Sequence, residues 1–214
     1  IIHGSRESKR DRNWYLVNSS YMQKNGVAVL LPDKRGSEKS QGDWRTSSFE
    51  DLATDTQAAI DFMKSQELVE VSQIGIIGMS QGGMIAPIVA SHSQDLDFAI
   101  NMTGSSFTMH EQLLYEFNME MRETGFLPGI SNALSYVNTI VFEKISGKEW
   151  YEAVGNYDPL PYWRKVSIPA LILHGSDDHN VNSAESKARF EELGMDNIRV
   201  IMYEGSGHGL QDPP

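Results

Sequence analysis

Short apolar runs alternate with helix-like segments along most of the chain. The runs lie at Val27–Leu31, Ile74–Ile77, Phe98–Met102, Ala170–Leu173 and Ile198–Met202. This alternation is typical of parallel strands joined by crossover helices, and such strands are apolar throughout because helices cover both faces of the sheet. The sequence therefore predicts an α/β fold with three layers around a mostly parallel central sheet.

Three of the connecting segments carry helix signals. Ser47 and Glu50 have the spacing of a capping box ahead of apolar residues at helical intervals. Further helices are expected at 81–91 and 183–193, the second of them preceded by the capping residue Asn182. Each helix connects two of the expected strands.

The stretch from 105 to 165 interrupts this alternation. It is far longer than the dozen or so residues that a crossover needs, and it is rich in aromatic residues. We expect a helical cap inserted into the core, which divides the chain into core residues 1–104, cap residues 105–165 and core residues 166–214. Two longer crossover helices with aromatic core faces are the alternative, because aromatic stripes more often pack than bind ligands.

The two ends of the sequence look trimmed. The chain starts with Ile1 and Ile2, inside an apolar strand pattern, and only a short polar stretch follows the last glycine-rich loop. We therefore expect a longer protein with further sequence upstream.

Composition excludes several classes of function. The chain has 18 basic and 29 acidic residues, a net charge of −11 that repels nucleic acid and anionic lipid. No apolar run approaches the roughly 18 residues of a membrane span. The absence of cysteine excludes disulfides, thiolate metal ligands and a cysteine nucleophile. Compartment and oligomeric state stay open.

Ser80 lies where a predicted strand meets a predicted helix, in the sequence Gly78-Met79-Ser80-Gln81-Gly82. A Gly-x-Ser-x-Gly sequence at such a junction is typical of a nucleophile elbow, in which the serine backbone is strained and the glycines let strand and helix approach closely. A glycine-rich turn whose serine merely caps the helix is the alternative. We expect Ser80 to be a catalytic nucleophile.

A serine hydroxyl needs a base, usually a histidine that is oriented by a carboxylate. His208 follows the last predicted strand in a glycine-rich turn, and Asp177 and Asp178 follow the strand before it. On chemistry alone the choice between the two aspartates is close to even. The order serine, acid, histidine is that of one large class of α/β enzymes, and the mechanism needs no cofactor.

A metal site is a less favoured alternative at the same strand ends. Its ligands would come from His174, Asp177, Asp178, His179 and His208. Imidazoles and carboxylates suit zinc, but no predicted helix carries a pair of histidines at metal-binding spacing, and a serine nucleophile makes a metal unnecessary.

The negative oxygen of a tetrahedral intermediate needs prearranged hydrogen-bond donors. We expect one donor to be the backbone N–H of Gln81, which follows the nucleophile. The second is expected from the His3-Gly4-Ser5 segment, from the N–H of Ser5 rather than that of Gly4. An ordinary strand-end turn is the alternative for this segment.

These motifs resemble the α/β-hydrolase superfamily over nearly the whole chain. The segments His3-Gly4-Ser5, Asp33-Lys34-Arg35-Gly36 and Gly78–Gly83 look like bacterial carboxylesterases related to dienelactone hydrolases and serine aminopeptidases. Members more often carry histidine and glutamate where Met79 and Gln81 stand here.

The resemblance also implies roles for single residues. In the family pattern the acid lies three residues after a glycine and three before a valine, which matches Asp178 between Gly175 and Val181. The family histidine matches His208, Arg35 matches an arginine that makes a structural ion pair, and a cap is implied at 105–165.

The favoured hypothesis is a serine hydrolase that cleaves small-molecule carboxylic esters. Ser80 attacks the carbonyl, His208 moves the proton, Asp178 orients the imidazole, and the amides of Ser5 and Gln81 bind the oxyanion.

Two alternatives remain. An aminopeptidase or amidase would use the same triad and would bind the substrate amine with carboxylates chosen from Glu111, Glu116, Glu120 and Glu123. A non-catalytic ligand-binding module on the same fold usually lacks a triad residue, and all three are present here.

Overall fold

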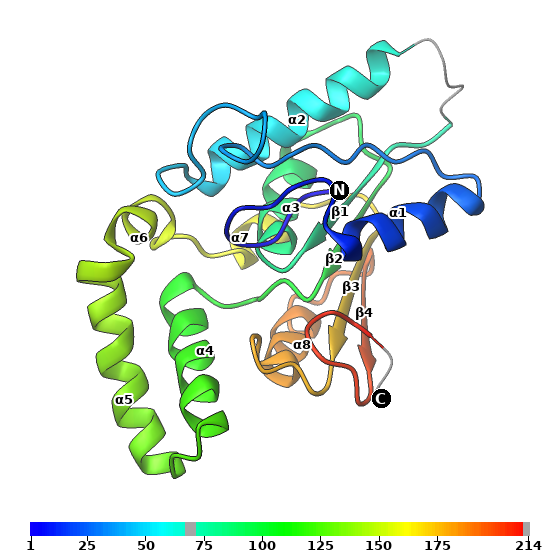
Figure 1. The fold of residues 1–214 in the computed structure, drawn as a ribbon. Coiled ribbons are helices and arrows are strands. Elements are labelled where there is room, and N and C mark those ends of the chain that lie inside the picture. The colour runs from blue at the N-terminus through cyan, green and yellow to red at the C-terminus, as the bar shows by residue number, and fades with distance from the viewer. Residues whose placement is uncertain (67–71, 212–214) are drawn as a thin grey trace.

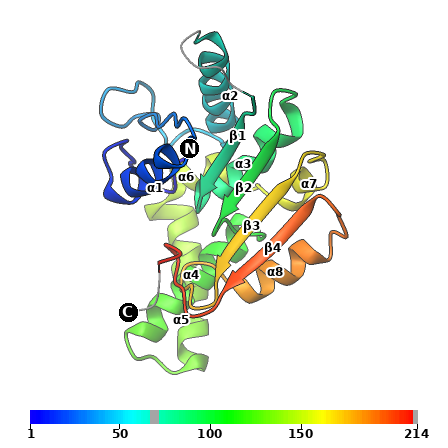
Figure 2. The same cartoon turned by 90° about the vertical axis from the view of Figure 1, so that its right-hand side faces the viewer.

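Figure 1 shows a computed structural model of the protein, in which residues 1–66 and 72–211 are described. Four parallel strands form the sheet, in the order β1 (Gly75–Met79), β2 (Phe98–Met102), β3 (Ala170–Gly175) and β4 (Ile198–Tyr203). Four of the five predicted strands are therefore confirmed. Because all four run in the same direction, their carboxyl ends meet at one edge of the sheet (Figure 2).

The fifth expected strand, Val27–Leu31, is not a strand in the structure. The segment lies beside the start of the chain, where the backbone nitrogen of Ile1 donates to the carbonyl of Leu30 over 3.0 Å. Ile2 in turn joins the sheet through a single parallel bridge to Gly78. The prediction was wrong because an apolar run becomes a strand only where a neighbouring ladder takes up its backbone groups.

Helices lie on both faces of the sheet (Figure 1). On one face, α3 (Gln81–His92) packs on β1 and β2, and α8 (Ser183–Glu191) packs on β3 and β4. α2 (Phe49–Ser65) packs against α3, and α1 (Asn13–Lys24) lies on the opposite face (Figure 2). The three-layer α/β architecture is confirmed, whereas the helix α1 was not predicted.

The N-cap of helix α2 lies one residue later than predicted. Ser48, not Ser47, accepts a hydrogen bond from the backbone of Asp51 over 3.1 Å, and the Asp51 carboxylate accepts from the Ser48 backbone over 2.9 Å. The Ser47 hydroxyl donates to the carbonyl of Asp43 instead. The expected pair of Ser47 and Glu50 is thus wrong by one position, because two overlapping pairs with the same spacing compete for the helix start.

The residues between β2 and β3 are helical. They form α4 (Met109–Glu123), α5 (Pro128–Val141), a π-helical turn at Phe142–Ser146, α6 (Lys148–Val154) and α7 (Leu160–Trp163). α4 and α5 lie side by side and extend away from the sheet beyond the carboxyl ends of its strands (Figure 1). Within the described part of the chain, no helix is both long and apolar enough to cross a lipid bilayer.

Candidate active site

Ser80 lies between β1 and α3 with φ 54° and ψ −117°, in the region that favours glycine. Its backbone N–H donates to the carbonyl of Met102 over 2.8 Å, which fixes the turn to β2. A Cβ on Gly78 would lie 2.1 Å from the carbonyl oxygen of Gly82, and a Cβ on Gly82 would lie 2.3 Å from that of Ile2. The two glycines are therefore required by the close approach of backbone segments.

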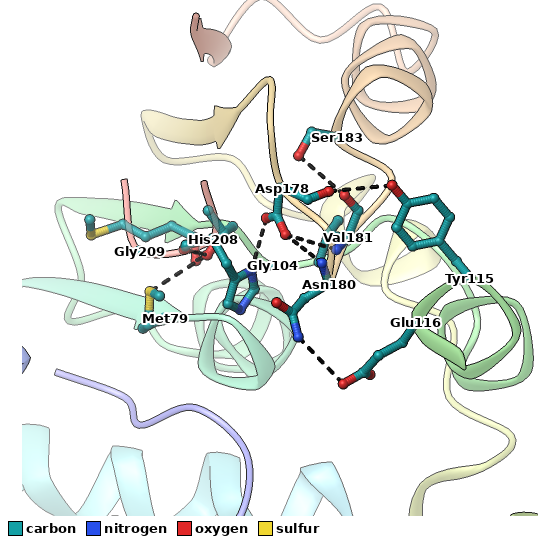
Figure 3. Close-up of polar contacts among 12 residues, drawn as sticks. Met79, Gly104, Tyr115, Glu116, Asp178, Asn180, Val181, Ser183, His208 and Gly209 are labelled. Carbon is teal, nitrogen blue, oxygen red and sulfur yellow. Dashed lines mark hydrogen bonds and ion pairs between the residues drawn. The ribbon is translucent and has the colours of Figure 1, made fainter. Parts of the chain in front are cut away.

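His208 and Asp178 are joined by a hydrogen bond of 2.8 Å between Nδ1 and Oδ2 (Figure 3). The other carboxylate oxygen of Asp178 accepts from the backbone N–H groups of Asn180, over 2.8 Å, and Val181, over 3.0 Å. Asp178 is only 3% exposed. Asp177 is exposed and accepts from Ser176, so the geometry pairs His208 with Asp178 and not with its neighbour.

The turn that carries His208 is held by two side chains from distant parts of the chain. Thr103, at the end of β2, donates its hydroxyl to the carbonyl of His208 over 3.0 Å. Trp14 of α1 donates its indole N–H to the carbonyl of Gly209 over 3.1 Å. These bonds fix a glycine-rich turn that would otherwise be free to move.

One cavity of about 340 Å³ brings the expected site residues together. Ser5, Ser80, Gln81 and His208 all line it. Among the described residues, no hydrogen bond joins the hydroxyl of Ser80 to the imidazole of His208. Such bonds are often loose before substrate binds, so the shared cavity is the informative observation.

The backbone hydrogen bonds distinguish Ser5 from Gly4, the two candidates for the second oxyanion donor. The N–H of Gly4 already donates to the hydroxyl of Tyr15 over 2.9 Å. The N–H groups of Ser5 and Gln81 make no hydrogen bond within the described part of the chain. Both are therefore available to a ligand in the cavity, whereas the N–H of Gly4 is not.

Sequence reasoning missed Lys34, which lies directly behind these amides. Its Nζ donates to the carbonyl of Gly4 over 2.8 Å and to the side-chain oxygen of Gln81 over 2.6 Å. Burial lowers the pKa of Lys34 to about 7. The only signal in the sequence was its place in the Asp33-Lys34-Arg35-Gly36 segment.

One wall of the cavity is acidic. Glu116 and Glu120, one turn apart on α4, both line it. Burial, followed by the charge of Glu120, raises the pKa of Glu116. Among the aromatic residues of 105–165, Trp150 alone lines the cavity within the described residues, and others pack on one another, as Phe117 does on Phe142.

The remaining expected residues are engaged elsewhere. His174 is fully buried beside Phe190, and burial lowers its pKa to about 4. His179 contacts the carboxylate of Glu123, and Arg35 makes the implied ion pair, with Asp55, at 2.7 Å. Within the described ranges, residues 1–66 and 72–211, no group of three or more metal-ligating side chains forms a candidate metal site.

The fold resembles that of an esterase of known structure. The esterase Pf2001 of Pyrococcus furiosus aligns with 97% of this chain and 71% of its own, with a TM-score of 0.71 and 18% sequence identity. The arrangement of sheet, helices and strand-end loops is the α/β-hydrolase fold.

A family model described as the C-terminal part of BAAT / acyl-CoA thioester hydrolases matches residues 56–214, and the chain belongs to this family. It is 22% identical over 223 residues to dipeptidyl peptidase family member 6 of Caenorhabditis elegans, covering 100% of this chain and 28% of that protein. It is 20% identical over 226 residues to esterase EstD of Thermotoga maritima, covering 97% of this chain and 53% of that protein. The chain thus spans about half or less of these relatives.

Proposed function

We propose that the protein hydrolyses carboxylic esters with Ser80 as nucleophile, His208 as base and Asp178 as the orienting acid. The observation that carries the proposal is the 2.8 Å bond between His208 and the buried Asp178, at a cavity that Ser80 also lines. The positive φ of Ser80 adds support, because a strained serine at a strand–helix junction is typical of a nucleophile.

The chemistry follows from these contacts. His208 accepts the proton of the Ser80 hydroxyl through Nε2, because its Nδ1 faces the carboxylate of Asp178. The Ser80 oxygen attacks the ester carbonyl, and the resulting oxyanion binds to the N–H groups of Ser5 and Gln81. His208 then protonates the leaving alkoxide, and water cleaves the acyl-enzyme by the reverse sequence of proton transfers.

Ser80→Ala tests this proposal directly. We expect kcat toward a small activated ester to fall by at least about 10³-fold, with the Tm nearly unchanged, because alanine keeps the Cβ and the same backbone conformation. Labelling with a fluorophosphonate should modify the Ser80 peptide in the wild type only. Unchanged turnover in the variant, or a well-folded wild type that neither turns over esters nor takes up label, would favour the non-catalytic alternative.

A peptide or amide substrate is the second candidate, and the acidic wall is the observation that favours it. Glu116 and Glu120 line the cavity from α4, where their carboxylates could bind a substrate ammonium group. Comparing an aminoacyl anilide with the corresponding aminoacyl ester separates the two candidates. Faster cleavage of the anilide would support the peptidase.

Thioesters react by the same steps, and the family name includes acyl-CoA thioester hydrolases. The net charge of −11 and the acidic wall both repel the phosphates of coenzyme A. We therefore expect an uncharged acyl thioester to be cleaved faster than the same acyl group on coenzyme A. The reverse order would identify an acyl-CoA substrate.

A further inference from the structure

The two hydrogen bonds of Lys34 converge on the two candidate oxyanion donors. The carbonyl of Gly4, which accepts from Nζ over 2.8 Å, belongs to the same peptide group as the N–H of Ser5. A cation bound to a peptide oxygen polarises the N–H at the other end of that peptide and fixes the plane in which it points. The second bond, 2.6 Å to the side chain of Gln81, holds the residue that carries the other N–H.

Lys34 is also a buried cation without an anionic partner. The residue is 7% exposed, and among the described residues no carboxylate lies within ion-pair distance of its ammonium group. Besides the two oxygens, it faces the ring of Trp44, with Nζ 5.5 Å from the ring centroid. An uncompensated buried charge is costly, so a site that keeps one is expected to use it.

We propose that Lys34 is the positioning residue of the oxyanion hole: its ammonium group orients the Ser5 and Gln81 amides and supplies the positive charge that balances the oxyanion. The inference rests on the proposed ester hydrolysis. Negative charge on the substrate oxygen exists only in the tetrahedral species, so Lys34 stabilises the transition state more than the bound ester.

Charged and titratable neighbours of Lys34 are otherwise engaged. Asp33 accepts from Arg10, and Arg35 pairs with Asp55. Burial, with smaller contributions from the charges of the amino terminus and of Lys34, lowers the pKa of His3 to about 4, so that this imidazole is neutral near pH 7. Across the cavity, His208 bonds to Asp178. A loss of activity in alkali that depends on Lys34 would thus report on its own ammonium group.

Lys34→Met removes the positive charge and both hydrogen bonds of the ammonium group, while the side chain keeps nearly the same length. We expect kcat for a small neutral activated ester to fall about 10- to 100-fold, less than the 10²- to 10³-fold typical of deleting an oxyanion donor itself, while KM changes less than about twofold. The inhibition constant of an alkyl boronic acid, which forms a tetrahedral adduct with the serine, should rise by a similar factor. In the wild type, kcat should decline above about pH 7 as the Lys34 ammonium group loses its proton, and this decline should be absent in Lys34→Met.

Lys39→Met is the matched control, because Lys39 is an exposed lysine of the same loop. It should keep the wild-type kcat and boronate affinity. Gln81→Met serves as a second variant in case Lys34→Met does not fold, since it removes one Lys34 partner and keeps the backbone N–H. Its kcat should fall about 3- to 10-fold at constant KM.

The outcomes separate this inference from the proposed function. A wild type without ester turnover and without fluorophosphonate label on Ser80 would refute the function itself. An active, labelled wild type together with a folded Lys34→Met of unchanged kcat and boronate affinity would overturn the role of Lys34 alone. The same holds if that variant raises KM only, or if it cannot be folded and Gln81→Met keeps the wild-type kcat.

Discussion

The helices α3 and α5 have similar lengths but opposite patterns of burial. α3 buries ten of its twelve residues, whereas α5 buries three of fourteen. The buried residues of α5 are the small polar side chains Ser131, Ser135 and Thr139, and its exposed residues include Ile130, at 50% exposure. An apolar helix is thus not by itself a core helix.

The neighbours of each helix explain the difference. α3 is surrounded by β1, β2, α2 and α7, so that an apolar side chain is buried on almost any of its faces. α5 lies mainly against α4, and the hydroxyl of Ser131 reaches Asn118 of α4 over 3.4 Å. Small residues on this face allow the two helices to approach, and the apolar face of α5 points outward.

The largest expected effect contrasts one glycine in each region. Gly78→Ala places a Cβ 2.1 Å from the Gly82 carbonyl and should lower the free energy of unfolding by about 4 kcal/mol or more, because backbone must move. Gly129→Ala in α5 meets nothing within 4 Å and should be neutral or stabilise by up to about 1 kcal/mol. Urea unfolding of both variants measures the contrast. Equal effects would contradict it.

The next largest expected effect on the free energy of unfolding contrasts two isoleucines, one in each helix. Ile85 of α3 is 1% exposed, so Ile85→Ala should cost about 2–5 kcal/mol through lost burial and a residual cavity. Ile130→Ala in α5 should cost less than about 1 kcal/mol, because half of that side chain already contacts water. Chemical denaturation at one pH compares the two. A large loss for Ile130 would mean that something covers this face of α5 in solution.

The buried face of α5 carries small side chains, and replacing one of them with a larger side chain tests whether α4 and α5 need this close contact. Ser135 is fully buried, and Ser135→Leu should cost about 1–3 kcal/mol by forcing α4 and α5 apart. The effect should be local, with faster amide hydrogen exchange in α4 and α5 and unchanged exchange in β2 and β3. Ser135→Ala is the control that keeps the small volume. Uniform acceleration across the sheet would show that α4 and α5 do not open separately.

The last prediction concerns the pH dependence of stability, which is small near pH 7 and grows only in acid. Burial lowers the pKa of His174 to about 4, so the unfolded chain, with an ordinary histidine pKa of about 6.5, binds the proton first as the pH falls. Its contribution to stability is complete above about pH 6.5 and is lost down to about pH 4, at up to about 1.4 kcal/mol per pH unit. His174→Leu should reduce this slope in urea unfolding at several pH values. An unchanged slope would contradict the assignment to His174.

Local sequence determined the elements that rest on short-range physics. Gly78, Ser80 and Gly82 mark the turn before α3 because few sequences satisfy such a close backbone approach, and Asn182 predicted the start of α8 because a cap acts within one turn. The expected pairing of an aspartate with His208 followed from the order of the strands, and the choice of Asp178 over Asp177 was supported by resemblance.

The tertiary structure decided what depends on partners far apart in the chain. Val27–Leu31 has the composition of a strand but no ladder to join, and α1 carries too weak a pattern to be seen without its packing. Lys34 looked like an ordinary charged loop residue until the fold set it against Gly4 and Gln81, which lie 30 and 47 positions away. Sequence encodes spacing along the backbone, whereas burial and the meeting of distant groups arise only when the layers pack.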